Sequence, residues 1–280
     1  DVFSVHAKTV LDVIGLSQTL GIPTALVGQG LGPVSDRYLK ESVRNTFNNL
    51  VLLSLREGMF SPAVSSEIGG VDEGKWIVTG DDAIEIGLAS KACSHSDFLG
   101  VNIRLASYAG VSTSQSAALG GLIVNAAKKF GTKIMILPVD ISGAGGDRQA
   151  TLGMLGFGQD SDFCIPDDES VESLVRAAGS CRVVITGSYH AAVFSLCRGV
   201  PVIAIVASKY YMYKFSGLAH QFPGGMRIID LSDESWALQL SEAVSVAWEV
   251  SKSVTDSLVS LAEEQLNVGQ QAYLRLRESC

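Results

Sequence analysis

The feature that most restricts the fold of this 280-residue chain is a repeated order of strand, loop and helix. Short apolar runs of strand length are predicted at 24–27, 50–55, 76–78, 99–105, 133–137, 162–165, 182–186, 202–206 and 227–229. Most of these runs are separated by segments with helical spacing of their apolar residues. Such alternation is typical of a parallel sheet that is covered by helices on both faces. The sequence therefore predicts an α/β protein.

The predicted strands fall into two blocks that are separated near residues 88–97. This predicts an N-terminal Rossmann-like domain at 1–96, a C-terminal one at 97–231 and a helical tail at 232–280. The first block has few strands, and the chain begins inside a predicted helix without an initiator methionine. We therefore expect that the first domain lacks an upstream segment.

Local signals define two of the helices in the second block. Ser112 with Gln115 forms a capping-box pattern, which predicts a long helix that ends at Gly131. Asp167 or Asp168 is expected to cap a later helix.

Charge and cysteine content exclude several classes of protein. The net charge is -8 without a run of like charges, which argues against nucleic acid because phosphate backbones require clustered Lys and Arg. The longest apolar run, at 200–207, is far shorter than the ~20 residues of a membrane span. Five cysteines without a C-x-x-C pair favour reduced thiols over disulfides or zinc. We expect a cytoplasmic protein without a transmembrane segment or a metal.

The loops that follow strands are the candidates for ligand binding in a doubly wound sheet. In the segment Thr186-Gly187-Ser188-Tyr189-His190, a strand ends and a helix begins. The unpaired N–H groups and the dipole of such a helix start favour phosphate or carboxylate. His190 adds a donor whose charge changes near neutral pH. The alternative is a structural helix start in which Ser188 is only the N-cap.

Other cations and aromatic rings follow strands in the second block. Lys209 can reach an anion, whereas the role of Lys214 stays open; Tyr210 offers a flat face for a sugar ring. Arg104 ends a strand, and Arg148 follows a glycine-rich loop; both can bind an anion through a guanidinium fork. The alternatives are an aromatic packing patch around the tyrosines and a surface loop with an N-cap Asp before Arg148.

In the first block, Gly28, Gln29 and Gly30 begin a glycine-rich loop that lacks the spacing of a dinucleotide site. Asp81 and Asp82 follow a later strand and can orient sugar hydroxyls or remove a proton. The alternative is a solvated helix cap. Arg56 also ends a strand and can face the same crevice.

These segments together resemble the polysaccharide pyruvyltransferase family. The resemblance extends over roughly residues 16–230 and rests on 28–33, 79–83, 185–194, 199–204 and 209–210. The stretch 182–218 is its specific part.

The resemblance implies a fold like that of the two-domain GT-B glycosyltransferases. It also implies transfer of a pyruvyl group from phosphoenolpyruvate to two hydroxyls of a sugar, with no further cofactor. His190 matches the family's donor-contacting His, and Lys209 matches the Lys after the following strand. The family has Arg where this chain has Ser188. Arg148, Arg104 or Lys209 is then expected to bind the donor anion.

A mechanism follows from this resemblance as a hypothesis. His190, or less favourably Tyr189, protonates the methylene carbon of the donor, and Asp82 or Asp81 assists the attacking hydroxyl. Two other functions remain open from the residues. One is a GT-B-type nucleotide-sugar glycosyltransferase or epimerase, and the other is a non-catalytic sugar-binding protein.

Overall fold

The computed structural model describes residues 4–68, 76–89, 97–103, 112–141, 146–156 and 162–279. It confirms the α/β class, because every strand pair in the described residues is parallel. The chain divides into two compact units. The first comprises Asp1–Asp82 with Glu263–Cys280, and the second comprises Ala83–Ala262.

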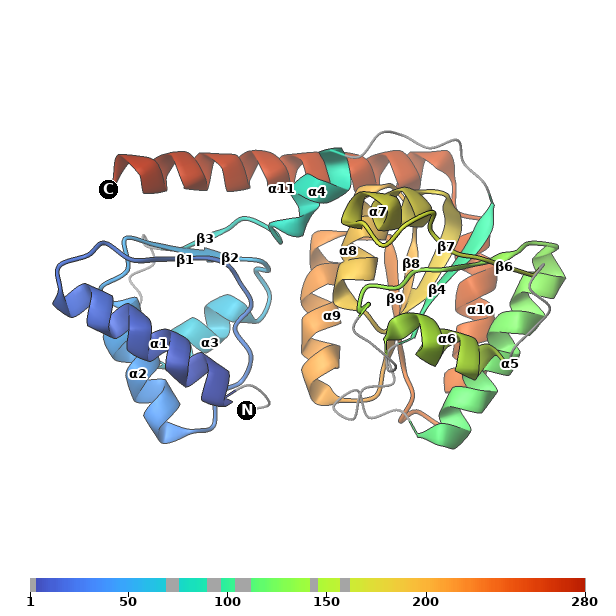
Figure 1. The fold of residues 1–280 in the computed structure, drawn as a ribbon, viewed down its shortest axis with the longest axis horizontal. Helices are drawn as coiled ribbons and strands as arrows, with labels where there is room; N and C mark the ends of the chain where they lie inside the picture. The colour runs from blue at the N-terminus through green and yellow to red at the C-terminus, as the bar shows by residue number, and fades with distance from the viewer. Residues whose placement is uncertain are drawn as a thin grey trace. The chain divides into compact units, whose positions relative to one another are not determined.

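The first unit contains a three-stranded sheet in the order β1-β2-β3 within its described residues. Its strands are β1 (Ala25–Gln29), β2 (Leu52–Leu55) and β3 (Trp76–Val78), and its helices are α1 (Ser4–Thr19), α2 (Arg37–Phe47) and α3 (Ser61–Ile68). The three helices lie on one side of the sheet (Figure 1). Leu53 and Leu55 of β2 join apolar side chains of these helices in one core. Alternate residues of a strand share a face, which explains this pairing.

The second unit contains a six-stranded sheet in the order β6-β5-β4-β7-β8-β9 within its described residues. The strands are β4 (Phe98–Asn102), β5 (Ile134–Ile136), β6 (Phe163–Cys164), β7 (Cys181–Thr186), β8 (Val202–Val206) and β9 (Met226–Asp230). In sequence order this is the 3-2-1-4-5-6 arrangement of a Rossmann fold. The direction of winding reverses between β4 and β7, so the carboxyl ends of these two strands mark the expected ligand crevice.

Helices cover both faces of this second sheet (Figure 1). The helices that lie wholly within this unit are α4 (Ala83–Ala89), α5 (Thr113–Phe130), α6 (Asp147–Leu155), α7 (Val171–Gly179), α8 (Tyr189–Cys197), α9 (Lys209–Gln221) and α10 (Trp236–Trp248). Side chains of α5 and α10 form one core with β4, β7 and β8. Helix α8 contacts α4, α7 and α9, and all of its residues except His190 are buried. The strands are therefore apolar on both faces, as a covered parallel sheet requires.

Two predicted helix caps have different outcomes. Ser112 and Gln115 form the expected capping box, and Gly131 ends α5 with a φ of 62°. The prediction that Asp167 or Asp168 caps α7 is wrong, because the N-cap is Ser170. The Asp168 carboxylate instead accepts the Ser170 N–H at 2.8 Å, and hydrogen bonds from Ser170 lower the pKa of Asp168.

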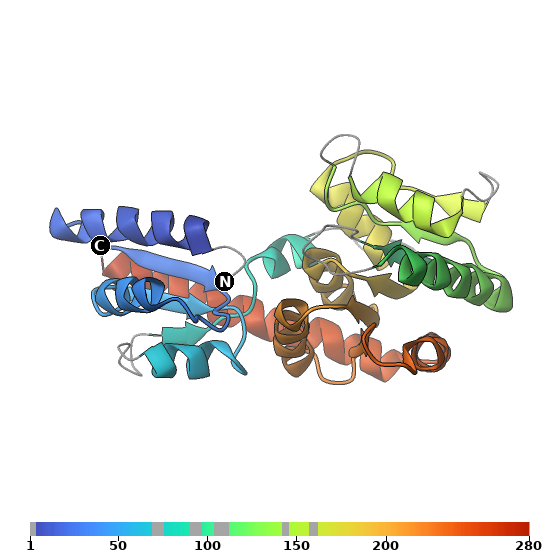
Figure 2. The ribbon, with the colours of Figure 1, turned by 90° about the horizontal axis from the view of Figure 1, so that it is seen from below.

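Helix α11 (Lys252–Glu278) begins in the second unit and ends in the first. It is one continuous helix, shown in red in Figure 2. Leu258 and Ala262 are fully buried near its beginning, and Ala272 is buried near its end. The chain therefore passes between the units at two places, once after Asp82 and once within α11.

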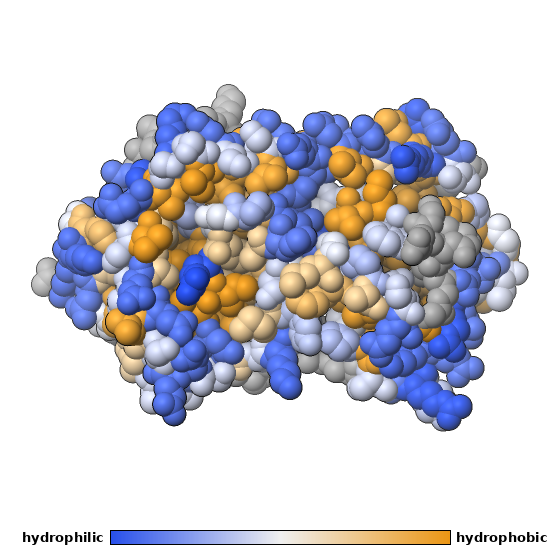
Figure 3. Space-filling view, turned by 180° about the vertical axis from the view of Figure 1, so that it is seen from behind, coloured by the Kyte–Doolittle hydropathy of each residue, from blue (hydrophilic) through white to orange (hydrophobic). Residues whose placement is uncertain are grey.

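The surface carries apolar side chains interspersed with polar ones. Figure 3 shows several apolar groups on the face opposite to that of Figure 1. Leu238 and Val246 of α10 are among the exposed apolar residues. No helix in the described ranges is long and apolar enough to cross a membrane.

Candidate functional site

Two groups of predicted site residues lie at the carboxyl ends of strands, one group in each unit. The first unit brings together Gly28, at the end of β1, and Asp82, which follows β3. Gly28 has a φ of +62°, and a Cβ atom there would lie 2.5 Å from Oδ2 of Asp82. The exposed Asp82 carboxylate thus lies directly against the Gly28 backbone. Glycine at this position permits both the backbone conformation and the close approach.

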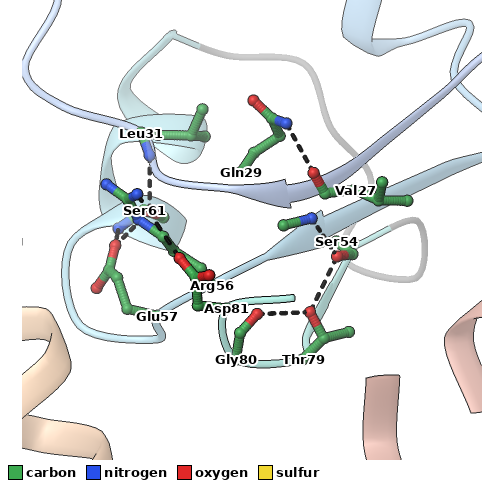
Figure 4. A network of polar contacts seen from close by, with 11 residues as sticks. Val27, Gln29, Leu31, Ser54, Arg56, Glu57, Ser61, Thr79, Gly80 and Asp81 are labelled. Carbon is green, nitrogen blue, oxygen red and sulfur yellow. Dashed lines mark hydrogen bonds and ion pairs between the residues drawn. The ribbon is translucent and has the colours of Figure 1, made fainter. Parts of the chain in front are cut away.

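Arg56 occupies the space beside Gly30 in the same unit. A Cβ atom on Gly30 would lie 2.3 Å from Nε of Arg56 and 2.4 Å from its Nη2. Nη1 of Arg56 is 4.0 Å from Oδ2 of Asp81, and the two side chains are 19% and 10% exposed. Figure 4 shows Arg56 and Asp81 beside each other at this edge. The glycine-rich loop therefore makes room for a guanidinium that faces a carboxylate.

Hydrogen bonds of buried hydroxyl groups hold the end of β1 in place at this edge. Ser54 of β2 accepts the Gly28 N–H at 2.8 Å and shares a hydrogen bond of 2.9 Å with the Thr79 hydroxyl. The sequence analysis did not single out Ser54. A serine inside an otherwise apolar strand was the available signal, because a buried hydroxyl needs a hydrogen-bond partner.

Glu57 is buried and fixes the start of α3. Its carboxylate accepts the N–H groups of Met59 and Phe60, each at 2.8 Å, and that of Ser61 at 2.6 Å. The Ser61 hydroxyl bonds to the same carboxylate and accepts the Leu31 N–H at 2.9 Å (Figure 4). Negative charge at a helix N-terminus is stabilised by these donors. Glu57 therefore ties the glycine-rich loop to α3 as a structural residue.

Gln29 has a local role in the structure. Its Nε2 donates to the Val27 carbonyl at 2.7 Å, which holds the side chain beside the end of β1 (Figure 4).

In the second unit, Asn102 and Asp147 form a buried network at the end of β4. Nδ2 of Asn102 donates to the Leu137 carbonyl at 2.7 Å and to Oδ2 of Asp147 at 2.8 Å. The same Asp147 oxygen accepts the N–H groups of Val139 and Asp140 at 3.1 and 2.9 Å. Asp147 is the first residue of α6, and the N-cap is Gly146. The network anchors the loop after β5 to the end of β4.

The turn from β7 into α8 is attached to the same network. The Gly187 N–H donates to the Asn102 carbonyl at 2.9 Å, and the Ser188 N–H donates to the Thr186 hydroxyl at 2.8 Å. Thr186 and Ser188 are buried. Ser188 stands at the N-cap position, but its hydroxyl makes no capping hydrogen bond. These two contacts, rather than a cap by the Ser188 hydroxyl, therefore position the start of α8.

The first two residues of α8 differ in exposure. Tyr189 is 3% exposed, whereas the His190 side chain is exposed. Their rings meet edge to face, with centroids 5.8 Å apart. Nζ of Lys214 lies over the Tyr189 ring at 4.6 Å from its centroid, and at 5.8 Å from that of Tyr210. A lysine from α9 thus reaches the first residue of α8.

Comparisons with known proteins agree with this architecture. Residues 5–208 match the family model of polysaccharide pyruvyl transferase. The chain belongs to this family. The match supports a transferase, and it confirms the resemblance seen in the sequence. Among curated protein sequences, none matches.

Solved structures show which fold this pyruvyltransferase shares. A protein described as a UDP-N-acetylglucosamine 2-epimerase from Listeria monocytogenes has a TM-score of 0.66 at 12% identity, over 95% of this chain and 70% of that one. UDP-GlcNAc 2-epimerase from Neisseria meningitidis, bound to UDP-GlcNAc, has a TM-score of 0.64 at 14% identity, and the match covers 94% of this chain and 72% of that one. Arabidopsis thaliana UGT89C1, complexed with quercetin, has a TM-score of 0.55 at 10% identity, and the match covers 99% of this chain and 76% of that one. The expected GT-B-like fold is thus confirmed.

The remaining predicted site residues of the pyruvyltransferase occupy separate places. Lys209 is the first residue of α9 and is exposed, and Tyr210 after it is half-buried with its ring edge-on to that of Tyr211. Arg148 is exposed on α6. Arg104 lies outside the described residues.

The described residues include no group of three or more His, Cys, Asp or Glu that could hold a metal ion.

The sequence analysis did not single out Asn102. Its signal was a single amide at the end of an apolar strand that is followed by a loop.

Proposed function

We propose that this pyruvyltransferase transfers the pyruvyl group of phosphoenolpyruvate to two hydroxyls of a sugar in a polysaccharide or glycan precursor. The observation that supports this proposal most strongly is the turn from β7 into α8. It lies at the reversal point of a Rossmann sheet, it places the exposed His190 at a helix start, and it belongs to a chain of this family.

The donor is proposed to bind at the start of α8. Phosphoenolpyruvate carries a phosphate and a carboxylate, and either group is attracted by the positive end of a helix dipole. Gly187, Ser188 and Tyr189 supply the backbone of this start. The N–H groups of Gly187 and Ser188 already donate to Asn102 and Thr186, so the turn is preformed and the dipole of α8 supplies the attraction for the donor.

The proposed reaction gives His190 the role of general acid. The imidazolium protonates the methylene carbon of the donor, and the oxygen of one sugar hydroxyl bonds to the neighbouring carbon. A second hydroxyl oxygen then bonds to that carbon as the bond to phosphate breaks. One hydroxyl proton restores the imidazolium of His190 and the other leaves with phosphate, so the products are a cyclic ketal and inorganic phosphate.

The acceptor is proposed to bind at the edge formed by Gly28, Gly30, Arg56, Asp81 and Asp82. Carboxylates accept hydrogen bonds from sugar hydroxyls, and the exposed Asp82 can also remove a proton from one of them. Arg56 lies beside Asp81 and can donate to ring or hydroxyl oxygens of the sugar.

The reaction is also proposed to take place in the cytoplasm. Cys164 and Cys181 form no disulfide bond, which suits a reducing compartment.

Phosphate release from phosphoenolpyruvate in the presence of candidate sugars tests this function. His190→Ala should lower kcat by about 100- to 10,000-fold, the usual contribution of a general acid. His220→Ala is the matched control, because His220 is an exposed histidine in the last turn of α9. Unchanged release by the His190→Ala protein would eliminate the proposed role of His190.

Thermal shift with phosphoenolpyruvate and with uridine-diphosphate sugars tests the donor class. A larger stabilisation by the nucleotide sugars would favour a glycosyltransferase or epimerase of the same fold. Stabilisation by phosphoenolpyruvate without phosphate release for any sugar would favour a non-catalytic binding protein.

A further inference from the structure

Lys214 carries its charge from the middle of α9 to the start of α8. Its Nζ atom is 4.6 Å from the ring centroid of Tyr189, the first residue of α8. Side chains on a helix lean toward its N-terminus, so the Tyr189 ring lies beside the first turn. The ammonium of Lys214 thus lies against the side chain of the first residue of α8.

The two aromatic rings hold this lysine in place. The Tyr210 centroid is 5.8 Å from Nζ, and Tyr189 itself is 6.2 Å from the ring of Phe215, which is fully buried. Cations are attracted to the faces of tyrosine rings within about 6 Å. The ammonium therefore has a defined position rather than the spread of positions available to a surface lysine.

The electrostatics of this position favour an anionic ligand. The N-terminus of α8 is the positive end of its dipole, and a cation beside it raises the local positive potential further. An anion that binds there is attracted by the helix dipole and by the ammonium together. Lys214 is half-buried, where charge interactions are less screened than in water.

Lys209 is more exposed to water than Lys214. It is the first residue of α9 and its side chain is exposed, so its ammonium is more strongly hydrated. Part of its attraction for an anion is lost to water and to salt.

We propose that Lys214, rather than Lys209, is the residue that selects an anionic donor by binding its phosphate or carboxylate beside Tyr189. This inference rests on the proposed function, because it assigns the charge that holds the donor of that reaction. It makes Lys214 a donor-binding residue and leaves proton transfer to His190.

Steady-state kinetics with phosphoenolpyruvate test the proposal through three variants. Lys214→Met keeps an unbranched stem against the rings and removes the charge. It should raise the KM for phosphoenolpyruvate by about 10- to 100-fold, as expected for the loss of one charge-assisted hydrogen bond. The kcat should stay within about threefold of wild type, since ground-state binding is what is lost. Lys214→Arg should restore most of the affinity, and Lys209→Met should raise KM less than Lys214→Met does.

Calorimetric titration with inorganic phosphate and with phosphoenolpyruvate separates this inference from the proposed function. If no sugar supports pyruvyl transfer but Lys214→Met abolishes binding of either anion, the function is wrong and the role of Lys214 stands. If transfer proceeds and Lys214→Met has a wild-type KM, or Lys209→Met has the larger effect, the role of Lys214 is overturned and the function stands. Thermal melting of each variant without ligand shows whether it is folded; a Lys214→Met protein that fails to fold leaves Lys214→Gln to decide by the same criteria.

Discussion

Two adjacent glycines of α5 provide a matched test of how closely the second unit is packed. Gly120 is buried, and a Cβ atom there would lie 2.0 Å from the carbonyl oxygen of Met154 in α6. Gly121 is exposed, and nothing lies within 4 Å of its Cβ position. Replacing either glycine by alanine therefore adds one methyl group to the same helix. Only the methyl group at position 120 would meet a neighbouring atom.

The helix-propensity gain is common to both substitutions and amounts to about 1 kcal/mol. Gly121→Ala should therefore raise the free energy of unfolding by about that amount. In Gly120→Ala, the Met154 backbone would have to move away by roughly 1.4 Å to reach an ordinary contact, and such overpacking costs about 1–3 kcal/mol or more. The shift also strains the hydrogen bond between Asp147 of α6 and Asn102. Gly120→Ala should thus be less stable than Gly121→Ala by at least about 1–3 kcal/mol.

Urea unfolding followed by circular dichroism measures this difference directly, because the slope with denaturant should be the same in both variants. The thermal midpoint should differ by about 2–4 °C for each kcal/mol in a unit of this size. Equal stability of the two variants would refute the close approach of α5 to the α6 backbone.

Three further predictions concern other described residues. Gly30→Ala should displace the Arg56 guanidinium and raise the acceptor KM about tenfold, whereas Gly32→Ala, with nothing within 4 Å of its Cβ, should leave it unchanged. Glu57→Gln should lower the free energy of unfolding by about 1–2 kcal/mol, since the charged cap of α3 is lost. Burial raises the pKa of the Cys181 thiol, so the folded protein keeps a proton that the unfolded chain loses above about pH 8.5. Stability should fall above that pH by up to about 1.4 kcal/mol per unit, and Cys181→Ala should remove this part of the decline.

Each of these predictions has a result that contradicts it. Equal acceptor KM values for Gly30→Ala and Gly32→Ala would show that Arg56 does not contribute to the acceptor site. A change below about 0.3 kcal/mol on denaturant unfolding of Glu57→Gln would remove its capping role. The same loss of stability between about pH 8 and pH 10 in wild type and Cys181→Ala would mean that other groups cause the decline.

Local sequence signals predicted most elements of the fold. The apolar, β-branched run at 182–186 predicts β7, and the following Gly187 predicts a turn into a helix. Ser112 with Gln115 predicted the start of α5 because a capping box is a contact between residues three positions apart. The cap of α7 was predicted wrongly, since several acidic and hydroxyl residues in 167–170 satisfy the same local rule.

The candidate site was less predictable, because its contacts join residues that are distant in the chain. Asn102 meets Asp147 across 45 positions, and this pairing depends on which strands lie next to β4. Arg56 was one of two arginines that end predicted strands until the structure placed it against Gly30. Lys214 meets Tyr189 only because α9 packs beside α8.

The sequence by itself determined the alternation of strands and helices, the caps of α5, the turn into α8 and the family resemblance. These features depend on residues that are near one another along the chain, where periodicity and capping rules apply. Only the tertiary structure decided the strand order β6-β5-β4-β7-β8-β9, the assignment of the end of α11 to the first unit and the contacts of Arg56, Asn102 and Lys214. These features depend on packing between segments that are distant in the chain. The same local patterns are compatible with several such packing arrangements.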